Sequence, residues 1–426
     1  MAYGAGSEYR GINIWRRFCF AHIVPKDNGA PMPPKLCLHY FRAEDKPEFT
    51  GATEENQLRA MNEYLRKDMK PDVWWIDAGW YPCDYNWPRI GTWKVDEARF
   101  PRGLAPIGKA CKENDIDLLL WFEPERAVLG TNVITKHPDW FIIRPNQTSN
   151  LLNLGNEDAK NYVKHLLVDY AKKLNLSCYR QDFNFLPANW FEYGDEENRR
   201  GITEIKHILG MYEVWEYLLE NVPGIIIDNC ASGGRRIDIE SLKRSIPFFR
   251  SDYQCAFNEN PEVLQTHNAN ASAYFPYIGC TSKTKNDTYA IRSSYSSSWG
   301  GAFYNTIFQT MGKEDFLWAK KITDEYLEVR QYFSLDFYNH GTNVFDDTSW
   351  AIFEYSNAKT NSGIILAFRR SNSPFDNVTI DLKGVMKDKI YTAYDYDSKN
   401  TVEFKNSLKI TLPNKRSSAL IHYNLK

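Results

Sequence analysis

Between Pro34 and Ser298 the chain alternates short apolar runs with longer amphipathic segments. This alternation is typical of βα units that build a parallel sheet. The predicted strands are residues 35–41, 72–80, 117–125, 176–184, 224–230, 247–253 and 272–279, with a last strand near 299–304. We therefore predict an α/β fold, a TIM (β/α)8 barrel, over residues 34–333.

Apolar residues recur at helical spacing between these strands, for example in residues 53–69, 156–174 and 201–220. Thr53 is followed by two acidic residues, a pattern that resembles a capped helix start. These segments are predicted to form the helices of the barrel.

The periodicity changes after a long helical stretch at residues 313–333. Strand-like runs separated by turn residues then continue to the C-terminus, which predicts an antiparallel β-sandwich domain over residues 334–426. Residues 1–33 are rich in arginine and aromatic residues, and we expect an N-terminal extension or linker there. A length of 426 residues favours two domains, since single cores stop growing at about 250–300 residues.

The composition excludes several classes of function. A formal net charge of −2 and the lack of a basic stripe argue against nucleic acid and acidic membranes as partners. No apolar run has the length of a transmembrane helix. The histidines lack metal-binding spacing and the eight cysteines are widely spread, so we predict no metal, no cofactor and mostly reduced thiols.

Aromatic residues make up 15% of the chain, including 13 Trp and 26 Tyr. Flat aromatic faces suit the apolar face of a sugar ring, although aromatic residues also fill ordinary cores. The sequence leaves the oligomeric state open. It also leaves open whether the protein acts in a bacterial cytoplasm or is secreted after removal of an export signal.

Acidic residues gather at the predicted carboxyl ends of the strands. They are Asp77, Glu123, Glu125, Asp182, Asp228 and Asp252. A TIM barrel builds its active site at this end. Any one of these acidic residues could equally well be the N-cap of the following helix. It is improbable that all of them are N-caps.

Asp182 and Asp252 are the strongest candidates for a catalytic pair, because glycoside hydrolysis generally uses two carboxyl groups. Arg180 lies two residues before Asp182, on the same side of a strand, and its charge would keep Asp182 ionised. The aromatic neighbours of Asp252, Phe249 and Tyr253 among them, would raise the pKa of its carboxyl towards that of a general acid.

Several motifs in this order resemble the bacterial, melibiase-like α-galactosidases of glycoside hydrolase family 36. They are WWIDAGWY, LLLWFEPERA, YRQDFN, DNCASGGRRID and RSDY, between Trp74 and Tyr253. The resemblance implies a retaining hydrolase without a cofactor. In such an enzyme Asp182 forms a covalent glycosyl-enzyme, and Asp252 protonates the leaving group and then deprotonates water.

The resemblance also implies contacts to the sugar. The residues concerned are Asp77, Trp80, Trp121, Glu123, Arg180, Cys230, Gly233 and Gly234. Glycines suit such a place because they let the backbone approach a ligand. The alternative is that Trp121 and Cys230 belong to the core and that the glycines form an ordinary turn.

The chain departs from the family pattern at Ala78, where a second aspartate is common, and at Gln181, where tryptophan is usual. It therefore resembles a divergent branch that acts on an oligosaccharide or glycoconjugate. Exo-hydrolysis of terminal α-galactose is the leading hypothesis, and α-galactosaminidase or α-N-acetylgalactosaminidase activity is the second. Galactosyl transfer and sugar binding without catalysis remain further alternatives. Whether that family's N-terminal β-domain precedes residue 1 stays open.

Overall fold

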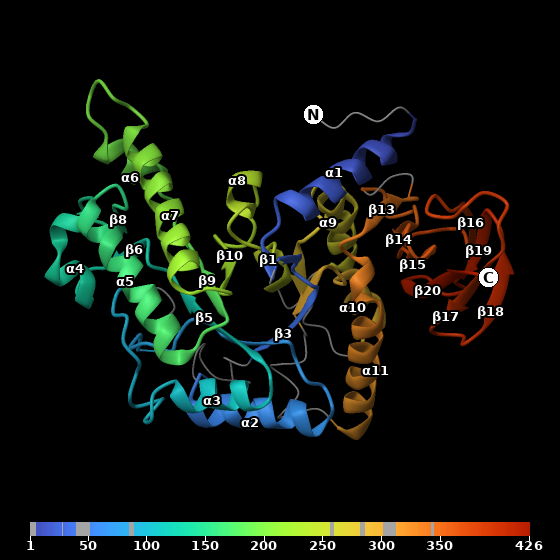
Figure 1. Cartoon of the computed structure of the whole chain (residues 1–426), viewed down its shortest axis with the longest axis horizontal. Helices are drawn as coiled ribbons and strands as arrows, with labels where there is room; N and C mark the ends of the chain where they lie inside the picture. The colour runs from blue at the N-terminus through green and yellow to red at the C-terminus, as the bar shows by residue number, and fades with distance from the viewer. Residues whose placement is uncertain are drawn as a thin grey trace.

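The centre of the computed structural model is a curled, seven-stranded parallel sheet with the order β10-β9-β5-β4-β3-β12-β11 (Figure 1). The structure describes all residues except 1–5, 28, 40–51, 85–88, 256–259, 282–285, 301–311 and 342–344. The strands are β3 (Lys35–His39), β4 (Val73–Ile76), β5 (Asp117–Phe122), β9 (Cys178–Gln181), β10 (Ile226–Asn229), β11 (Gly279–Thr281) and β12 (Ser298–Gly300). The predicted TIM-like barrel is confirmed.

Residues 246–250 fill the gap in this sheet between β10 and β11. Ile246 forms an isolated parallel bridge with Asp228, and the N–H of Gly279 donates to the carbonyl of Pro247 at 2.7 Å. A Cβ atom on Gly279 would lie 1.9 Å from the carbonyl oxygen of Phe248, so only glycine permits this approach. The prediction of a regular strand over 247–253 is wrong, because this segment forms bridges rather than a continuous ladder.

The predicted strand at 272–279 is also misplaced. Helix α9 (Pro261–Tyr274) occupies its first residues, and β11 begins only at Gly279. The side chain of Asn260 caps the helix by accepting the N–H of Glu262 at 3.0 Å, and proline in the first turn favours the helix start. The predicted last strand corresponds to β12, and residues 301–304 lie outside the described residues.

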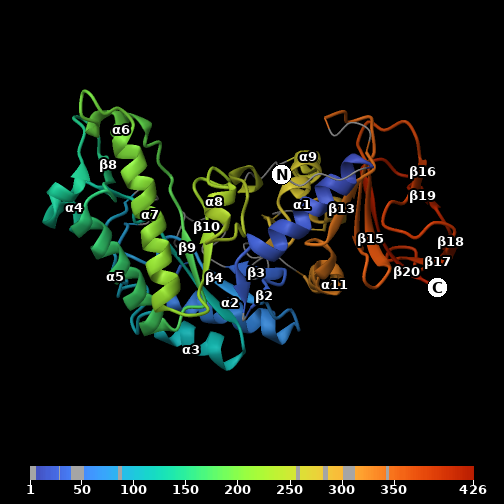
Figure 2. The same cartoon turned by 45° about the horizontal axis from the view of Figure 1, so that its top comes forward.

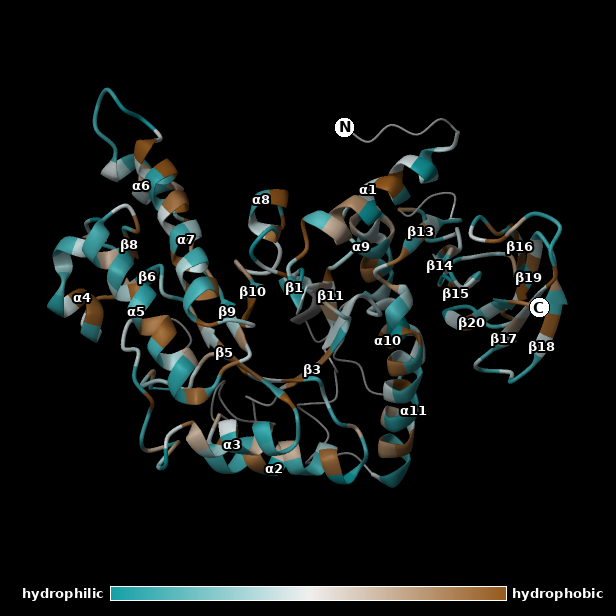
Figure 3. Cartoon of the chain, viewed as in Figure 1, coloured by the Kyte–Doolittle hydropathy of each residue, from teal (hydrophilic) through white to brown (hydrophobic). Residues whose placement is uncertain are grey.

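Helices surround the curled sheet, and their hydrophobic sides alternate with hydrophilic ones (Figure 3). Thr53 caps α2 as predicted, since its hydroxyl accepts the N–H of Asn56 at 3.2 Å. The helices are α2 (Glu54–Arg66), α3 (Ala105–Glu113), α4 (Asn132–Lys136), α5 (Glu157–Leu174), α6 (Ala188–Gly194), α7 (Ile202–Asn221), α8 (Ile239–Leu242), α10 (Thr288–Ser293) and α11 (Lys313–Val329). In the described ranges, no helix is both long and apolar enough to cross a membrane.

The C-terminal part consists of two antiparallel sheets with a common apolar core. The larger contains β13 (Asp336–Asn339), β14 (Ala351–Asn357), β15 (Ser362–Arg369), β20 (Ser417–Leu425), β17 (Tyr391–Asp395) and β18 (Thr401–Phe404). The smaller pairs β16 (Asn377–Asp381) with β19 (Ser407–Thr411). Both faces of β15 are buried, because Ile365 faces the sandwich core while Leu366 joins the core shared with the barrel.

Three short strands next to β5 form a small antiparallel sheet in the order β6-β8-β7. They are β6 (Arg126–Val128), β7 (Phe141–Ile142) and β8 (Ser149–Leu152). This sheet leads the chain away from the end of β5 and back towards α5, so it borders the site described below.

The N-terminal segment, expected to be an extension or linker, contains the helix α1 (Glu8–His22) before the short hairpin β1 (Lys26–Asp27) and β2 (Ala30–Pro31). Helix α1 lies against α9 and β13 (Figure 2). The guanidinium of Arg16 is buried and donates to the backbone carbonyls of Phe333 and Leu335. This segment therefore contributes to the packing between the barrel and the C-terminal sheets.

Candidate active site

Alternation along the strands places the candidate residues inside the barrel. Trp121 of β5, Arg180 of β9 and Asp228 of β10 are direct neighbours in the strand register, so they form one layer. Asp182 follows two residues after Arg180 and therefore points the same way, towards the open carboxyl end. Gln181 points in the opposite direction, out of the barrel.

Asp182 is only 5% exposed and its carboxylate is held by several donors. The indole N–H of Trp121 and the side-chain amide of Asn184 donate to its Oδ2, at 3.2 Å and 2.7 Å. The backbone N–H groups of Phe183 and Ser232 donate to its Oδ1, at 2.7 Å and 3.2 Å. Such donors fix the carboxylate in place and favour its ionised form.

Arg180 sets the charge around Asp182. Its guanidinium forms an ion pair with the fully buried Asp228 and lies 4.2 Å from the ring centre of Trp75. Burial acts to raise the pKa of Asp182, but the charge of Arg180 and the hydrogen bonds to the carboxylate outweigh it. The pKa of Asp182 is therefore lower than usual.

Asp252 opens the short 3-10 helix η2 (Asp252–Cys255) and its side chain is exposed to solvent. Partial desolvation raises the pKa of Asp252, and the negative charge of Asp182 raises it further. The two carboxyl groups are thus within electrostatic reach and have opposite protonation preferences. The expectation that Asp252 ends a strand is wrong. The fold nevertheless brings Asp252 close enough to Asp182 for the charge of one carboxyl group to act on the other.

Gly233 and Gly234 approach the protein's own backbone. A Cβ atom on Gly233, whose φ is +81°, would lie 2.7 Å from the backbone nitrogen of Asp252. A Cβ atom on Gly234 would lie 2.3 Å from the carbonyl oxygen of Arg250. The loop after β10 therefore packs directly against the segment that carries Asp252, and glycine is what makes this contact possible.

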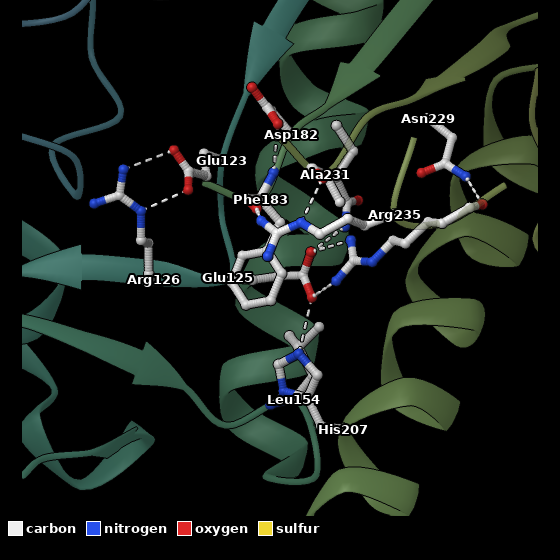
Figure 4. A network of polar contacts seen from close by, with 12 residues as sticks. Glu123, Glu125, Arg126, Leu154, Asp182, Phe183, His207, Asn229, Ala231 and Arg235 are labelled. Carbon is white, nitrogen blue, oxygen red and sulfur yellow. Dashed lines mark hydrogen bonds and ion pairs between the residues drawn. The ribbon is translucent and has the colours of Figure 1, made fainter. Parts of the chain in front are cut away.

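Glu123 is a buried residue that holds neighbouring residues of the site in place by hydrogen bonds. Its buried carboxylate accepts from the guanidinium of Arg126, at 2.5 Å and 2.9 Å, and from the backbone N–H of Asn184 at 2.5 Å (Figure 4). Burial raises the pKa of Glu123 to about 7, against the opposing charge of Arg126. Glu123 is 0% exposed and holds Asn184, and its expected contact with the sugar stays a prediction.

The expected contact of Trp80 with the sugar also stays a prediction. Its indole is fully buried, donates to the carbonyl of Trp121 at 2.8 Å and packs against Phe122 and Tyr81. Trp80 therefore fixes the end of β5 as part of the core. Asp77 is partly exposed and its Oδ1 accepts the N–H of Ala78 at 2.7 Å.

Cys230 lies beside the carboxylate of Asp182 and lowers the pKa of that group through a hydrogen bond. The thiol is buried, and burial raises its pKa well above the ordinary value. The N–H of Gly233 donates to its Sγ at 3.3 Å. Cys230 is therefore a neutral thiol at the floor of the site. The cysteines with described side chains are all buried.

A buried network of hydrogen bonds and ion pairs around Glu125 was not predicted from the sequence. The carboxylate of Glu125 accepts from Arg236 at 2.6 Å and 2.7 Å, from Gln181 at 2.6 Å and from His207 at 2.8 Å (Figure 4). The Nδ1 atom of His207 accepts the N–H of Leu154, so Nε2 carries the proton towards Glu125. This network ties the loop after β10 to the ends of β5 and β9.

Replacement of Glu125 with alanine is expected to destabilise the fold by about 3–5 kcal/mol, because the buried guanidinium of Arg236 loses its counter-charge. The charge of Arg236 and the bonds from His207 overcome burial and lower the pKa of Glu125 to about 2. Its ionised form therefore stabilises the protein above pH 4–5, roughly the unfolded pKa, and this contribution fades as the pH falls towards 2.

Urea denaturation at pH 7 and at pH 3 measures both effects, with the exposed Glu197→Ala as the matched control. The difference between wild type and Glu125→Ala should be smaller at pH 3. A difference that is the same at both pH values, or equal losses in the two variants, would contradict this account.

Two cavities are lined by residues that lie next to Asp182 or Asp252. One of about 630 Å³ is lined by Asn184 and Ser232, which both contact Asp182, and by Arg235. The other, about 1080 Å³, is lined by Arg235 and Ser251 and extends along α9. Within the described residues, no group of three or more His, Cys, Asp or Glu side chains is placed to hold a metal ion.

Residues 53–262 match the melibiase family model. Over this stretch the chain resembles the melibiases. The α-galactosidase Mel36A of Lactobacillus acidophilus is 23% identical to this chain over 205 residues, which cover 46% of this chain and 28% of that protein. The matched part of the chain thus spans less than a third of the length of this relative.

Solved structures show the same fold over nearly the whole chain. The galactosidase domain of the α-galactosidase-sucrose kinase AgaSK superimposes with a TM-score of 0.80 at 15% identity, covering 98% of this chain and 58% of that one. A variant of the family 36 α-galactosidase AgaA from Geobacillus stearothermophilus, in complex with stachyose, gives a TM-score of 0.78 at 16% identity and the same coverage.

Proposed function

We propose that the chain is a retaining, exo-acting glycoside hydrolase that releases terminal α-linked galactose-type residues. One observation carries the proposal. Two carboxyl groups at one end of the barrel have opposite protonation preferences: the pKa of Asp182 is lowered and that of Asp252 is raised. Such a pair assigns the nucleophile to the ionised group and the general acid to the protonated one.

In the first step a carboxylate oxygen of Asp182 attacks the anomeric carbon of the sugar. The glycosidic C–O bond breaks, and the proton of Asp252 moves to the leaving oxygen. In the second step the ionised Asp252 takes a proton from water, whose oxygen attacks the same carbon and releases Asp182. Two inversions at the anomeric carbon leave its configuration unchanged.

The surrounding residues position this pair. Asn184 and the N–H of Ser232 hold Asp182, and Trp121 supports it from the strand beside it. The charge of Arg180 keeps Asp182 ionised, and Asp228 holds Arg180 in place. Asp77, which directly precedes Ala78, is a partly exposed residue among the predicted sugar contacts. We propose that its carboxylate accepts hydrogen bonds from hydroxyl groups of the sugar.

The substrate panel that tests this proposal consists of 4-nitrophenyl α-galactoside, α-N-acetylgalactosaminide and α-galactosaminide. We expect kcat/KM to be highest for the galactoside. A single missing or additional group in a pocket changes kcat/KM by about 10–200-fold, so the panel separates the candidates clearly.

Preference for an amino sugar would favour the second candidate function, for which Ala78 supplies the structural reason: its methyl group replaces a charged acceptor in the family pattern. Cleavage of none of the three sugars, with binding of galactose retained, would contradict the hydrolase proposal and favour a binding protein. Proton NMR of the first sugar released distinguishes retention from inversion.

A further inference from the structure

Arg250 lies two residues before Asp252 and has an unusual environment. Its side chain is 5% exposed, yet its Nε and Nη1 atoms have no hydrogen-bond partner among the residues that the structure describes. Its Nη2 atom makes a long contact of 3.4 Å to the carbonyl of Leu264. Burying a guanidinium without an anionic partner costs several kcal/mol, so proteins rarely retain one without a use.

The side chain of Arg250 lines the cleft of about 1080 Å³ that runs along α9. This volume is comparable to that of ordinary ligand pockets, which measure roughly 300–1000 Å³. Ser251, the residue between Arg250 and Asp252, lines the same cleft. The cleft therefore lies beside the proposed general acid, which is where the leaving group of a glycoside departs.

The two acids among the described residues that line the cleft, Glu262 and Asp347, have other partners than Arg250. Glu262 accepts from the backbone N–H and the hydroxyl of Ser371, at 2.9 Å and 2.7 Å, and Asp347 accepts from Asn372 at 2.7 Å. Both acids instead interact with Arg370, the other buried arginine of the cleft: burial lowers the pKa of Arg370, and the charges of the two acids oppose this shift without cancelling it. Their charges therefore act on Arg370.

Two further side chains favour an anion next to Arg250. Arg235 is exposed at the mouth of the cleft and donates to the carbonyls of Ala231 and Phe183, which fixes its position. Within the described part of the chain His267 has a buried Nδ1 atom without a partner, and burial, together with the charge of Arg250, lowers its pKa to about 4. His267 is therefore neutral at pH 7 and offers a hydrogen bond.

Aromatic side chains at the rim complete the cleft. Tyr274 at the end of α9 is 61% exposed and Phe345 of the C-terminal part is 81% exposed, and both line the cleft. Exposed aromatic faces are suited to stacking on a sugar or aryl ring. The cleft thus combines a surface for a ring with a buried cation.

We propose that this cleft is the leaving-group subsite and that it binds an aglycone carrying a carboxylate, sulfate or phosphate, whose oxygens pair with Arg250. The planar guanidinium fits all three groups with two parallel hydrogen bonds. The inference rests on the proposed function for the identity of the leaving group, whereas the anion site itself is independent of catalysis.

Direct binding tests the anion site without turnover. Sodium sulfate, phosphate and benzoate are titrated calorimetrically into wild type, Arg250→Gln, Arg250→Lys and the control Arg199→Gln, whose side chain is exposed. We expect one of these anions to bind wild type and the control alike, and Arg250→Gln to bind it about 10–100-fold more weakly. Arg250→Lys should recover part of the affinity.

The anion that binds best identifies the charged group. Equal affinities of wild type and Arg250→Gln, or no binding of any of the three, would overturn the inference. Circular dichroism of each variant checks that the fold is retained, and Arg250→Met, which keeps the shape of the side chain, replaces Arg250→Gln if the latter fails to fold.

Catalysis gives a second test. The ratio of kcat/KM for 4-carboxyphenyl and 4-carbamoylphenyl α-galactoside should exceed about 10 in wild type and fall towards 1 in Arg250→Gln, because only the carboxylate pairs with the arginine. A ratio near 1 in wild type would overturn the inference while leaving the hydrolase proposal intact. Lack of cleavage of any galactoside would contradict the hydrolase proposal, and the titrations would still decide the anion site.

Discussion

Replacement of Asp182 with alanine is expected to lower kcat on an activated α-galactoside by about 10⁴-fold or more, as the loss of other enzymic nucleophiles does. This corresponds to about 5 kcal/mol of transition-state stabilisation. The physical reason is that Asp182 is a fixed, ionised carboxylate for which the described site offers no substitute: Glu123 is held by Arg126, and Glu125 by Arg236. Steady-state kinetics with 4-nitrophenyl α-galactoside measures the loss.

Added azide provides the diagnostic readout for this variant. The space left by the side chain admits the small anion, which attacks the anomeric carbon once, so the expected product is the β-glycosyl azide with inverted configuration. Asp139→Ala is the matched control, since Asp139 is exposed and lies on a short helix near α4. Activity of Asp182→Ala close to that of wild type would refute the assignment of the nucleophile.

The sequence was sufficient to predict Asp182 and its surroundings on the strand. Period-two alternation places Arg180 and Asp182 on one side of β9, and the parallel register brings Trp121 and Asp228 to the same layer. These relations depend only on strand identity and direction. The strand was recognisable because its apolar residues stand between clear helical segments.

Contacts between distant loops could not be predicted in this way. In the sequence Gln181 stands out only as a departure from the family pattern beside Asp182, yet it points outwards and joins Glu125 and Trp215 in a buried network. Of these two partners, one follows β5 and the other lies on α7, and single-sequence periodicity contains no information about which side chains meet. His207 and Arg236 were missed for the same reason.

Asp252 was identified from a motif, but its local structure was not. The apolar residues before it suggested a strand, whereas the backbone of residues 246–250 makes only isolated bridges. The reason lies in tertiary packing: Gly233 and Gly279 let other backbone segments approach so closely that they replace regular strand neighbours. Gly233 and Gly234, which were expected to contact the sugar, thus pack against the segment that carries the proposed general acid.

Replacement of Asp252 with alanine is expected to lower kcat/KM by about 10²–10⁴-fold for a substrate with a poor leaving group, such as an unactivated disaccharide. With a leaving group that needs no proton, such as fluoride, the first step should be almost unaffected. The glycosyl-enzyme then accumulates, because Asp252 is also the base that activates water, so KM should fall together with kcat.

The pH dependence of kcat/KM is the most direct test of whether Asp252 is the general acid. Catalysis requires Asp182 ionised, at pH values above its lowered pKa, and Asp252 protonated, at pH values below its raised pKa. Wild-type kcat/KM should therefore be bell-shaped, and Asp252→Ala should lose the fall on the alkaline side while it keeps the acidic one. Azide should restore turnover and yield the α-glycosyl azide, because attack occurs on the intermediate bound to Asp182. A β product, or an unchanged alkaline limb, would show that another group is the acid.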